Sequence, residues 1–122
     1  MSLRRARGDA GEQLAEQFLR DSGLRTLARN VRYRCGELDR VLIDGETLVF
    51  AEVRWRSGPG FGGARDSVGA TKQRRLIAAA QCFLQAHPRL SQLACRFDVL
   101  ALSGPPDKVA IEWIQDAFRI DA

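Results

Sequence analysis

CGELDRVLIDGETLVFAEVRWR, residues 35–56, contains two strand-like segments separated by a short polar turn. The second segment, residues 47–56, is rich in β-branched and aromatic residues, and the first, residues 37–43, is its expected antiparallel partner. Alternate side chains of a strand share one face, so Glu52 and Arg54 emerge from the same face of the second segment. The stretch therefore predicts a hairpin that presents a carboxylate beside a guanidinium.

The register of this hairpin determines which acidic side chains meet. A tight two-residue turn would pair Ile43 with Glu46, whereas a four-residue loop would pair Ile43 with Leu48. Both registers place Asp39 on the face of Glu52, and the longer loop sets these two directly opposite each other. Two like charges about 4 Å apart repel by roughly 4 kcal/mol at an effective dielectric near 20. We therefore expect a cation among these side chains.

Two interpretations of this acidic patch follow from the spacing. Carboxylates that converge from neighbouring strands form an oxygen site suited to Mg²⁺, a hard cation. Such an ion can bind a phosphodiester oxygen and lower the pKa of a bound water, and Arg54 would then contact the phosphate. The other interpretation is a ladder of cross-strand ion pairs, in which Glu37 pairs with Arg54. In that ladder Asp39 would pair with Arg40 or Arg56. The spacing leaves both interpretations open.

Length and composition indicate one globular domain. The chain has 122 residues, of which 45% are apolar and 28% charged, and this suits a single hydrophobic core. Its net charge of +4 favours polyanionic partners only weakly. Three cysteines without a CxxC spacing predict reduced thiols rather than a disulfide framework or a zinc site. No apolar run is long enough to span a membrane and no secretory signal is recognisable, so we expect a cytoplasmic protein.

Hydrophobic periodicity predicts two helices and five strands in the order α-β-β-β-α-β-β. The helices are expected from about residue 9 up to a stop at Gly23 and over residues 70–86, with one further helical turn within residues 115–120. The strands are expected over residues 24–33 (interrupted near Asn30), 37–43, 47–56, 96–102 and 109–114. Residues 1–7 are expected to form a flexible basic arm before a single domain, residues 8–122, and the glycine-rich residues 57–64 a mobile loop. This order predicts an α/β protein with a mixed central sheet flanked by helices.

Basic residues outside the hairpin are candidates for contacts with a nucleic acid. Arg56 and Arg65 flank the glycine-rich segment, which could fold over a nucleic acid or form a plain surface connection. Lys72, Arg74 and Arg75 lie in the first turns of the second helix, where the macrodipole disfavours cations. A phosphate docked at that helix terminus would reverse the argument, so we infer phosphate contacts there. Gln73 is expected to support the same nucleic-acid backbone.

Several short motifs occur along the chain in a fixed order. They are Gly11-Glu12 with Ala15, Asn30 with Arg32, Gly36-Glu37-Leu38-Asp39, Val49-Phe50-Ala51-Glu52-Val53-Arg54 with Arg56, Phe61-Gly62, Lys72-Gln73 and Arg96-Phe97-Asp98. Together they resemble the small bacterial YraN family, which is related to Holliday-junction resolvases, over nearly the whole chain. The resemblance implies the restriction-endonuclease-like fold.

The same resemblance implies a metal-dependent nuclease centre. Nucleases of this fold place an acid on the first helix, an aspartate on the second strand and a Glu-x-Lys motif on the third. These positions correspond here to Glu12, Asp39 and Glu52, which would hold Mg²⁺ or Mn²⁺. Arg54 stands where the family has lysine. Arginine keeps the positive charge and grips phosphate bidentately, but its high pKa prevents it from accepting a proton.

Two functions are compatible with these residues. The first is a Mg²⁺-dependent endonuclease-like protein that acts on DNA; branched or non-duplex substrates and a homodimer are implied by the relation to resolvases. The alternative is a catalytically silent nucleic-acid-binding module, in which Arg54 neutralises the acidic cluster. A protein-interaction domain that reuses the fold is a third reading. Whether arginine at position 54 permits turnover decides between the first two.

Overall fold

The computed structural model describes residues 3–56 and 68–119 of the chain. Helix α1 (Leu3–Asp21) is followed by strands β1 (Arg25–Tyr33), β2 (Gly36–Asp44) and β3 (Thr47–Trp55). Helix α2 (Ala70–Ala86), the short 3₁₀ turn η2 (Leu90–Gln92) and strands β4 (Ala94–Ser103) and β5 (Ala110–Phe118) complete it. The predicted α/β order is confirmed. The expected glycine-rich loop and Arg65 lie outside the described residues.

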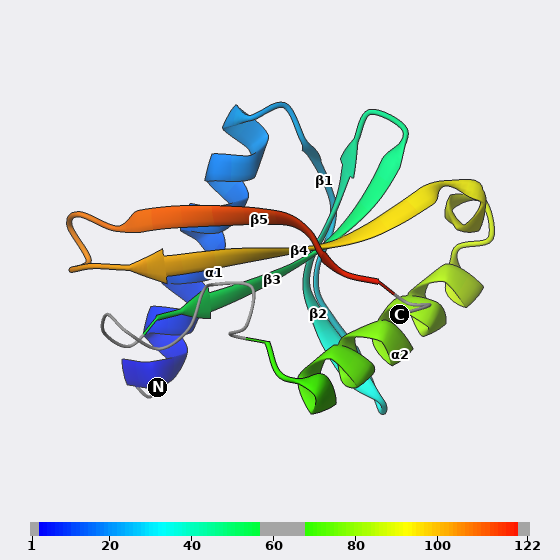
Figure 1. Cartoon of the computed structure of the whole chain (residues 1–122), viewed down its shortest axis with the longest axis horizontal. Coiled ribbons are helices and arrows are strands. Elements are labelled where there is room, and N and C mark those ends of the chain that lie inside the picture. Colours follow the sequence, from blue (N-terminus) through cyan, green and yellow to red (C-terminus); the bar gives the residue numbers. More distant parts are fainter. Residues whose placement is uncertain (1–2, 57–67, 120–122) are drawn as a thin grey trace.

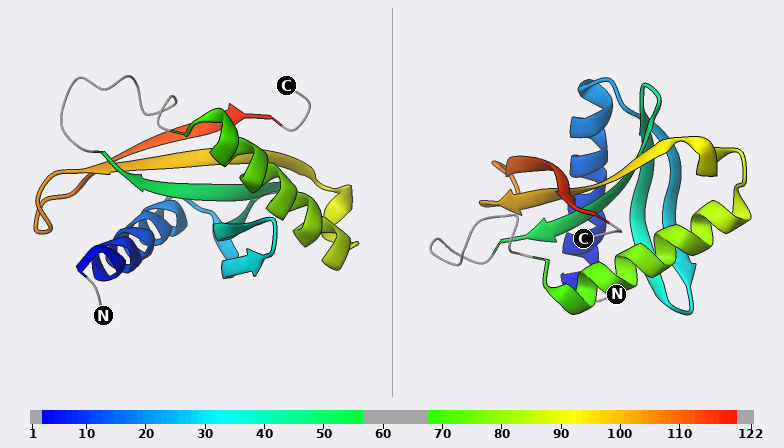
Figure 2. Two further views of the ribbon diagram at one scale, coloured as in Figure 1. Left: turned by 90° about the horizontal axis from the view of Figure 1, so that it is seen from below. Right: turned by 45° about the vertical axis from the view of Figure 1, so that its right-hand side comes forward.

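A single five-stranded sheet forms the centre, in the order β1-β2-β3-β4-β5. All neighbouring strands are antiparallel except β3 and β4, which run parallel. Parallel neighbours require a crossover connection, and α2 lies within the one that joins β3 to β4. Helix α1 and helix α2 both cross the sheet (Figures 1 and 2).

The two helices cover opposite faces of the sheet and bury separate cores. Along β3, Leu48 and Phe50 enter the core under α2, whereas Val49 and Ala51 enter the core under α1. The α2-side core also contains Leu38, Val41, Val68, Leu76, Ala79, Ala80, Phe83, Phe97 and Val99. The α1-side core also contains Ala15, Leu19, Leu24, Leu42, Leu100 and Leu102. Leu14 of α1 is exposed and belongs to neither core.

The ends of the chain differ from the sequence prediction. Helix α1 begins at Leu3, so it takes in most of the segment expected to be a flexible arm. Its other end agrees with the prediction, because the helix ends at Asp21, before Gly23 with its φ of 101°. The helical turn predicted within residues 115–120 is wrong, because β5 continues to Phe118. The Phe118 ring stacks on Phe97 with 4.8 Å between centroids, and this packing favours an extended end over a helical one.

The β2–β3 turn consists of Gly45 and Glu46, with Gly45 at a φ of 62°. Ile43 pairs with Leu48, which is the register predicted for the longer loop, although the loop has only two residues between paired positions. The alternative pairing of Ile43 with Glu46 is wrong. A turn at Gly45-Glu46 places the residue that most readily adopts a positive φ at its first central position.

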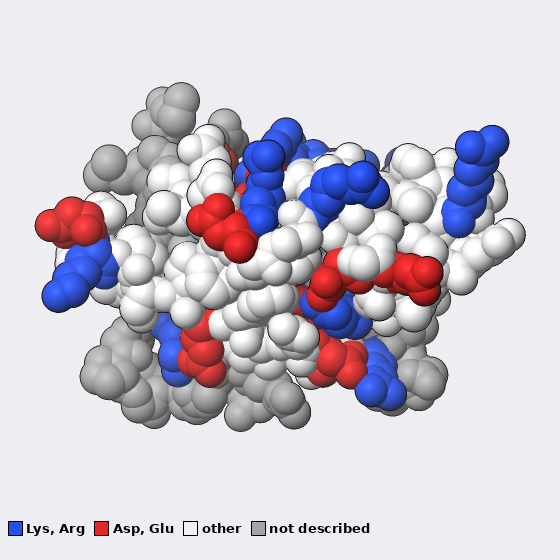
Figure 3. All heavy atoms as spheres, turned by 90° about the horizontal axis from the view of Figure 1, so that it is seen from above, with Lys and Arg blue, Asp and Glu red and all other residues white. Residues whose placement is uncertain are grey.

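Charges of both signs are interspersed on the face drawn in Figure 3, so the net charge of +4 does not form one broad positive field there. All three cysteines are free, as expected, and the Sγ atoms of Cys35 and Cys82 lie 3.5 Å apart. Within residues 3–56 and 68–119, no helix combines the length and apolarity that crossing a membrane requires.

Candidate functional site

Strands β1 and β2 are kinked together at Asn30 and Asp39. In a regular strand, residues three apart point to opposite faces. Here two such pairs enter the same α2-side core, Ala28 with Val31 and Leu38 with Val41. The φ of 51° at Asn30 places that residue in the left-handed region and accounts for the change of face in β1. The strand interruption predicted near Asn30 is therefore a kink within a continuous strand.

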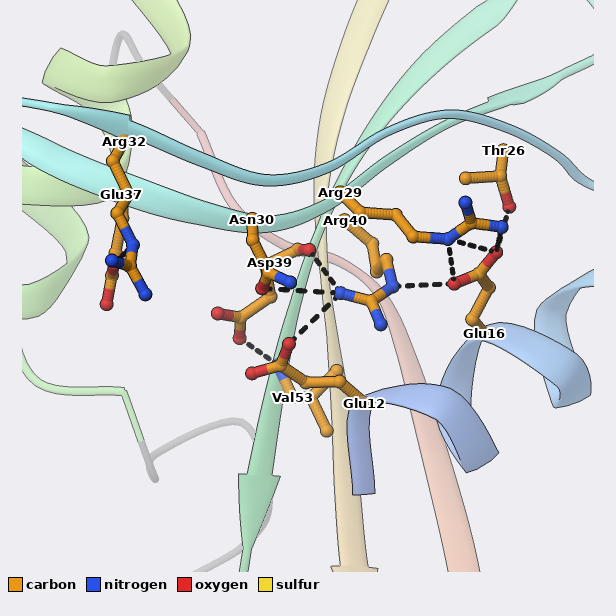
Figure 4. A network of polar contacts seen from close by, with 10 residues as sticks. All are labelled: Glu12, Glu16, Thr26, Arg29, Asn30, Arg32, Glu37, Asp39, Arg40 and Val53. Carbon is orange, nitrogen blue, oxygen red and sulfur yellow. Dashed lines mark hydrogen bonds and ion pairs between the residues drawn. The ribbon is translucent and has the colours of Figure 1, made fainter. Parts of the chain in front are cut away.

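The kink turns the side chain of Asp39 toward β3 instead of toward a face of the sheet. The paired ladder between β2 and β3 runs only as far as Arg40 and Ala51. Beyond that point Asp39 Oδ2 accepts a hydrogen bond from the backbone N–H of Val53 at 3.0 Å. Figure 4 shows this carboxylate spanning the gap between the strands. Its second oxygen is thus held at the place where the two strands separate.

Glu52 on β3 lies beside Asp39 and is almost completely buried, with 6% of its surface exposed. Its Oε2 atom has no hydrogen-bond partner. Burial raises the pKa of Glu52 well above its ordinary value, and the neighbouring Asp39 raises it further, while Lys72 and Arg54 oppose the rise. The structure thus brings together Asp39 and Glu52, as the sequence predicted, although Asp39 arrives through the kink and not through simple alternation.

Lys72 forms an ion pair with this site. It extends from the first turn of α2, and its Nζ lies 3.7 Å from Glu52 Oε2, with 38% of the side chain exposed. Arg54, two residues along β3 from Glu52, acts on the Glu52 carboxyl through its charge and is only partly exposed. The sequence marked Lys72 as a contact to a nucleic-acid backbone. Its position beside Glu52 results from the packing of the β3–β4 crossover, and no feature of the neighbouring sequence predicts it.

Glu12 approaches the same site from α1 but is engaged elsewhere. A Cβ at the preceding Gly11 would lie 2.6 Å from Trp55 Nε1, so glycine permits the close approach of α1 to β3. Glu12 Oε1 accepts from Arg40 Nη1 at 3.0 Å. Burial and the charge of Asp39 raise the pKa of Glu12, and Arg40 lowers it. Glu12 therefore neighbours the pair while being bound to Arg40.

The carboxylates near the kink differ from the three-ligand metal site that the sequence predicted. Among the described residues, no group of three or more His, Cys, Asp or Glu side chains is placed to hold a metal ion. The trio of Glu12, Asp39 and Glu52 is therefore not assembled as one ligand set. The pair of Asp39 and Glu52 does fit a hard cation, because it offers a buried oxygen that accepts no hydrogen bond next to a second carboxylate.

A second carboxylate cluster, which sequence reasoning missed, lies under α1. Glu16 accepts hydrogen bonds from Thr26, Arg29 and the buried Arg40, at 2.6 to 3.0 Å. These partners, led by Arg29, lower the pKa of Glu16 to about 2. Arg40 also donates to the backbone carbonyl of Asp39 at 2.8 Å, so the cluster holds β2 at the kink (Figure 4). The spacing of Glu12 and Glu16, four residues apart on one helix face, was the available signal.

The remaining candidate residues lie in other surroundings. The predicted ion-pair ladder is not formed, because Glu37 pairs with Arg32 at 3.3 Å and Arg56 pairs with Glu112 at 2.9 Å. Gln73 Nε2 donates to the Val68 carbonyl at 2.9 Å and so fastens the start of α2. Arg74 donates to the hydroxyl of Thr71 at 3.1 Å, and Arg75 is exposed.

Comparison with known proteins places the chain in a family. It matches the family described as "Uncharacterised protein family UPF0102" over residues 11–102. A UPF0102 protein of Stutzerimonas stutzeri is 51% identical over 98% of this chain and 99% of its own length. UPF0102 proteins of Xanthomonas campestris (52% identical, 98% and 97% covered) and Xylella fastidiosa (49%, 99% and 98%) are similar throughout. The chain belongs to the UPF0102 family.

Proposed function

We propose that this UPF0102 protein is a metal-dependent endonuclease that binds DNA and hydrolyses its phosphodiester bonds, with Asp39 and Glu52 as the ligands of Mg²⁺ or Mn²⁺. The observation that carries the proposal is the buried Oε2 of Glu52, which has no hydrogen-bond partner although a second carboxylate lies beside it. The resemblance to the YraN family and the resolvases supports DNA, with branched or non-duplex structure, as the substrate and a homodimer as the active form. A cytoplasmic location fits this role.

The cost of the arrangement supports a functional interpretation. A buried polar atom without a partner is destabilising by about 1–3 kcal/mol, and the great majority of such atoms in folded proteins are satisfied. Strongly perturbed carboxyl groups cluster at functional sites for this reason. A divalent cation would remove the repulsion between Asp39 and Glu52 and satisfy the free oxygen.

Each residue of the site has a role in this proposal. A bound divalent cation would supply Lewis acidity and lower the pKa of a coordinated water. Asp39, held by the Val53 amide, and Glu52 would fix the position of the ion. The guanidinium of Arg54 would hold the scissile phosphate through paired hydrogen bonds. Lys72 supplies the compact ammonium that the family has at position 54, because its Nζ already faces Glu52.

The test is a cleavage assay with labelled four-way junction, flap, single-stranded and duplex DNA in Mg²⁺ or Mn²⁺. Wild type is expected to cleave at least one non-duplex substrate, and Asp39→Asn is expected to abolish cleavage. Glu46→Gln, which removes an exposed carboxylate of the β2–β3 turn outside the pair, is the matched control and should cleave like wild type. Absence of cleavage by both wild type and Arg54→Lys would contradict the proposal. Cleavage that survives Asp39→Asn would indicate a contaminating nuclease.

A catalytically silent DNA-binding module is the second candidate. It is favoured by the presence of Lys72 at 3.7 Å from Glu52 Oε2, because an ammonium at this place can substitute for a metal ion. Titration of the protein with Mn²⁺, followed calorimetrically, separates the two functions. The endonuclease is expected to bind Mn²⁺ with a loss of affinity in Glu52→Gln. The silent module is expected to bind DNA with neither cleavage nor Mn²⁺ binding.

A further inference from the structure

A hollow of about 450 Å³ lies between the β1–β2 turn and the first turns of α2. Four cationic side chains line it, Arg32, Arg34, Lys72 and Arg75, with Glu37 as its one carboxylate. This concentration of positive charge contrasts with the interspersed charges on the face shown in Figure 3. Clusters of like charge repel one another, so their presence in one hollow points to an anionic ligand.

The hollow is built by close contacts between two segments that are distant in sequence. A Cβ at Gly36 would lie 2.6 Å from the backbone carbonyl oxygen of Arg75, so only glycine lets the turn approach α2 this closely. The thiols of Cys35 and Cys82, 3.5 Å apart, join the same two segments. The relative position of the arginines is therefore set by packing.

The cations of the hollow are available to a ligand. Arg32 is 79% exposed, and its 3.3 Å pair with Glu37, itself half exposed, is of the kind that contributes less than about 1 kcal/mol. Arg34 and Arg75 are also exposed. Exposed guanidinium groups bind phosphate oxygens bidentately. They are only weakly hydrated, so little hydration is lost on binding.

Lys72 connects the hollow to the carboxylate pair. It lines the hollow, and its Nζ lies 3.7 Å from Glu52 Oε2. A chain of phosphates that passed through the hollow would thus lead directly to Asp39 and Glu52. The partly buried ring of Tyr33 also lines the hollow, and aromatic rings among cations are the usual composition of sites for unpaired strands.

We propose that this hollow binds the phosphate backbone of a single DNA strand next to the scissile phosphate, with Arg32, Arg34 and Arg75 as the phosphate contacts. This inference rests on the proposed function and specifies the form of its substrate. The size of the hollow, within the roughly 300–1,000 Å³ typical of small-molecule sites, suits a few atoms of one strand rather than a duplex. Phosphate binding in the hollow also explains why basic residues lie at the N-terminal end of α2.

The experiment is fluorescence anisotropy with a labelled 12-nucleotide single strand in EDTA, so that binding is measured without metal or cleavage. The variant is Arg32→Ala/Arg34→Ala/Arg75→Ala. The matched control, Arg20→Ala/Arg25→Ala/Arg89→Ala, removes three exposed arginines remote from the hollow in sequence and structure. Circular dichroism verifies that both variants are folded.

The hollow variant is expected to lose at least tenfold in affinity and the control less than threefold. The slope of log affinity against log salt should fall by about 2 for the hollow variant, since each single-strand phosphate contact contributes about 0.7. Equal losses in the two variants, or tighter binding of the duplex of the same sequence, would overturn the inference.

Results for the inference and for the nuclease activity can be separated. Glu52→Gln is expected to bind the single strand at least as tightly as wild type in EDTA. Binding that depends on the hollow, without cleavage by wild type in Mg²⁺ or Mn²⁺, would support the inference while removing the nuclease proposal. Cleavage by wild type that is unaffected in the hollow variant would support the nuclease proposal and overturn the inference about the hollow.

Discussion

Glu16 and Glu52 are both nearly inaccessible to solvent, with 5% and 6% of their surfaces exposed. Their carboxyl groups nevertheless differ in their hydrogen bonds and in the direction of their pKa shifts. Glu16 is surrounded by donors and its pKa is lowered to about 2. Glu52 has an Oε2 atom that accepts no hydrogen bond and lies 3.7 Å from the Lys72 ammonium, and its pKa is raised. Burial alone therefore says little about the role of a charged residue. What its oxygens contact distinguishes a structural carboxylate from a candidate ligand.

The two clusters are joined through Arg40. This residue is bound to Glu16 and Glu12 and also donates to the Asp39 carbonyl. The satisfied cluster under α1 therefore fixes the backbone from which Asp39 extends toward Glu52. The hydrogen-bonded carboxylate of Glu16 thus lies on one side of the kink, and the Oε2 atom of Glu52, which accepts no hydrogen bond, lies on the other.

The largest effect is expected from Glu52→Gln, which removes the charge while keeping the shape. Cleavage should fall by about 10³-fold or more, equivalent to about 4 kcal/mol at the transition state. The free energy of unfolding should not decrease at neutral pH, because glutamine keeps the uncharged state that the raised pKa of Glu52 already favours in the folded protein. Single-turnover cleavage and urea denaturation of the same preparation measure both quantities. A large loss of stability would show that Glu52 is a structural carboxylate like Glu16.

Glu16→Gln should have the complementary effect. It leaves the buried guanidinium of Arg40 without one of its two carboxylates, and breaking such a pair destabilises a protein by about 3 kcal/mol or more. Urea denaturation measures the loss, and Glu46→Gln in the exposed β2–β3 turn is the control. An unchanged free energy of unfolding would mean that the cluster under α1 is dispensable.

Glu16 and Glu52 should change the free energy of unfolding with pH in opposite directions. Glu16, with a folded pKa near 2 against an ordinary value of 4.5, contributes stability that is present above pH 4.5 and lost as pH falls toward 2. Glu52 has a raised folded pKa, so above pH 4.5 the folded state holds a proton that the unfolded state has lost, and stability declines as pH rises.

The decline from Glu52 cannot exceed about 1.4 kcal/mol per pH unit. Urea denaturation of wild type and Glu52→Gln at pH 5, 6.5 and 8 measures it. The variant should gain stability relative to wild type as pH increases across this range. Parallel curves for the two proteins would contradict the raised pKa.

A smaller effect, about tenfold in cleavage or about 1.4 kcal/mol, is expected from Lys72→Met. The change removes the ammonium that faces Glu52 while keeping the length of the side chain. Lys108→Met is the matched control, since Lys108 is the other lysine of the chain and lies exposed before β5. If both variants cleave like wild type, Arg54 supplies the positive charge by itself.

The sequence predicted the elements and the meeting of Asp39 with Glu52, because hydrophobic periodicity and strand alternation are local properties. It predicted an interruption near Asn30 but not its form as a kink, since a positive φ is one of several conformations open to asparagine. The contact of Lys72 with Glu52 depends on how the β3–β4 crossover packs on the sheet. The burial of Arg40 between two glutamates was likewise unpredictable, because long-range packing determines it.

The position of Lys72 has a consequence for recognising similar sites. The ammonium that faces Glu52 comes from α2, the helix within the β3–β4 crossover, and not from the strand that carries the glutamate. A search pattern written along one strand would record only Glu52 and Arg54 and would pass over the lysine. A template of three points in space, Asp39, Glu52 and Lys72, would retrieve such sites whatever residue occupies the strand position. In that template, distance in the fold replaces spacing in the sequence as the signature.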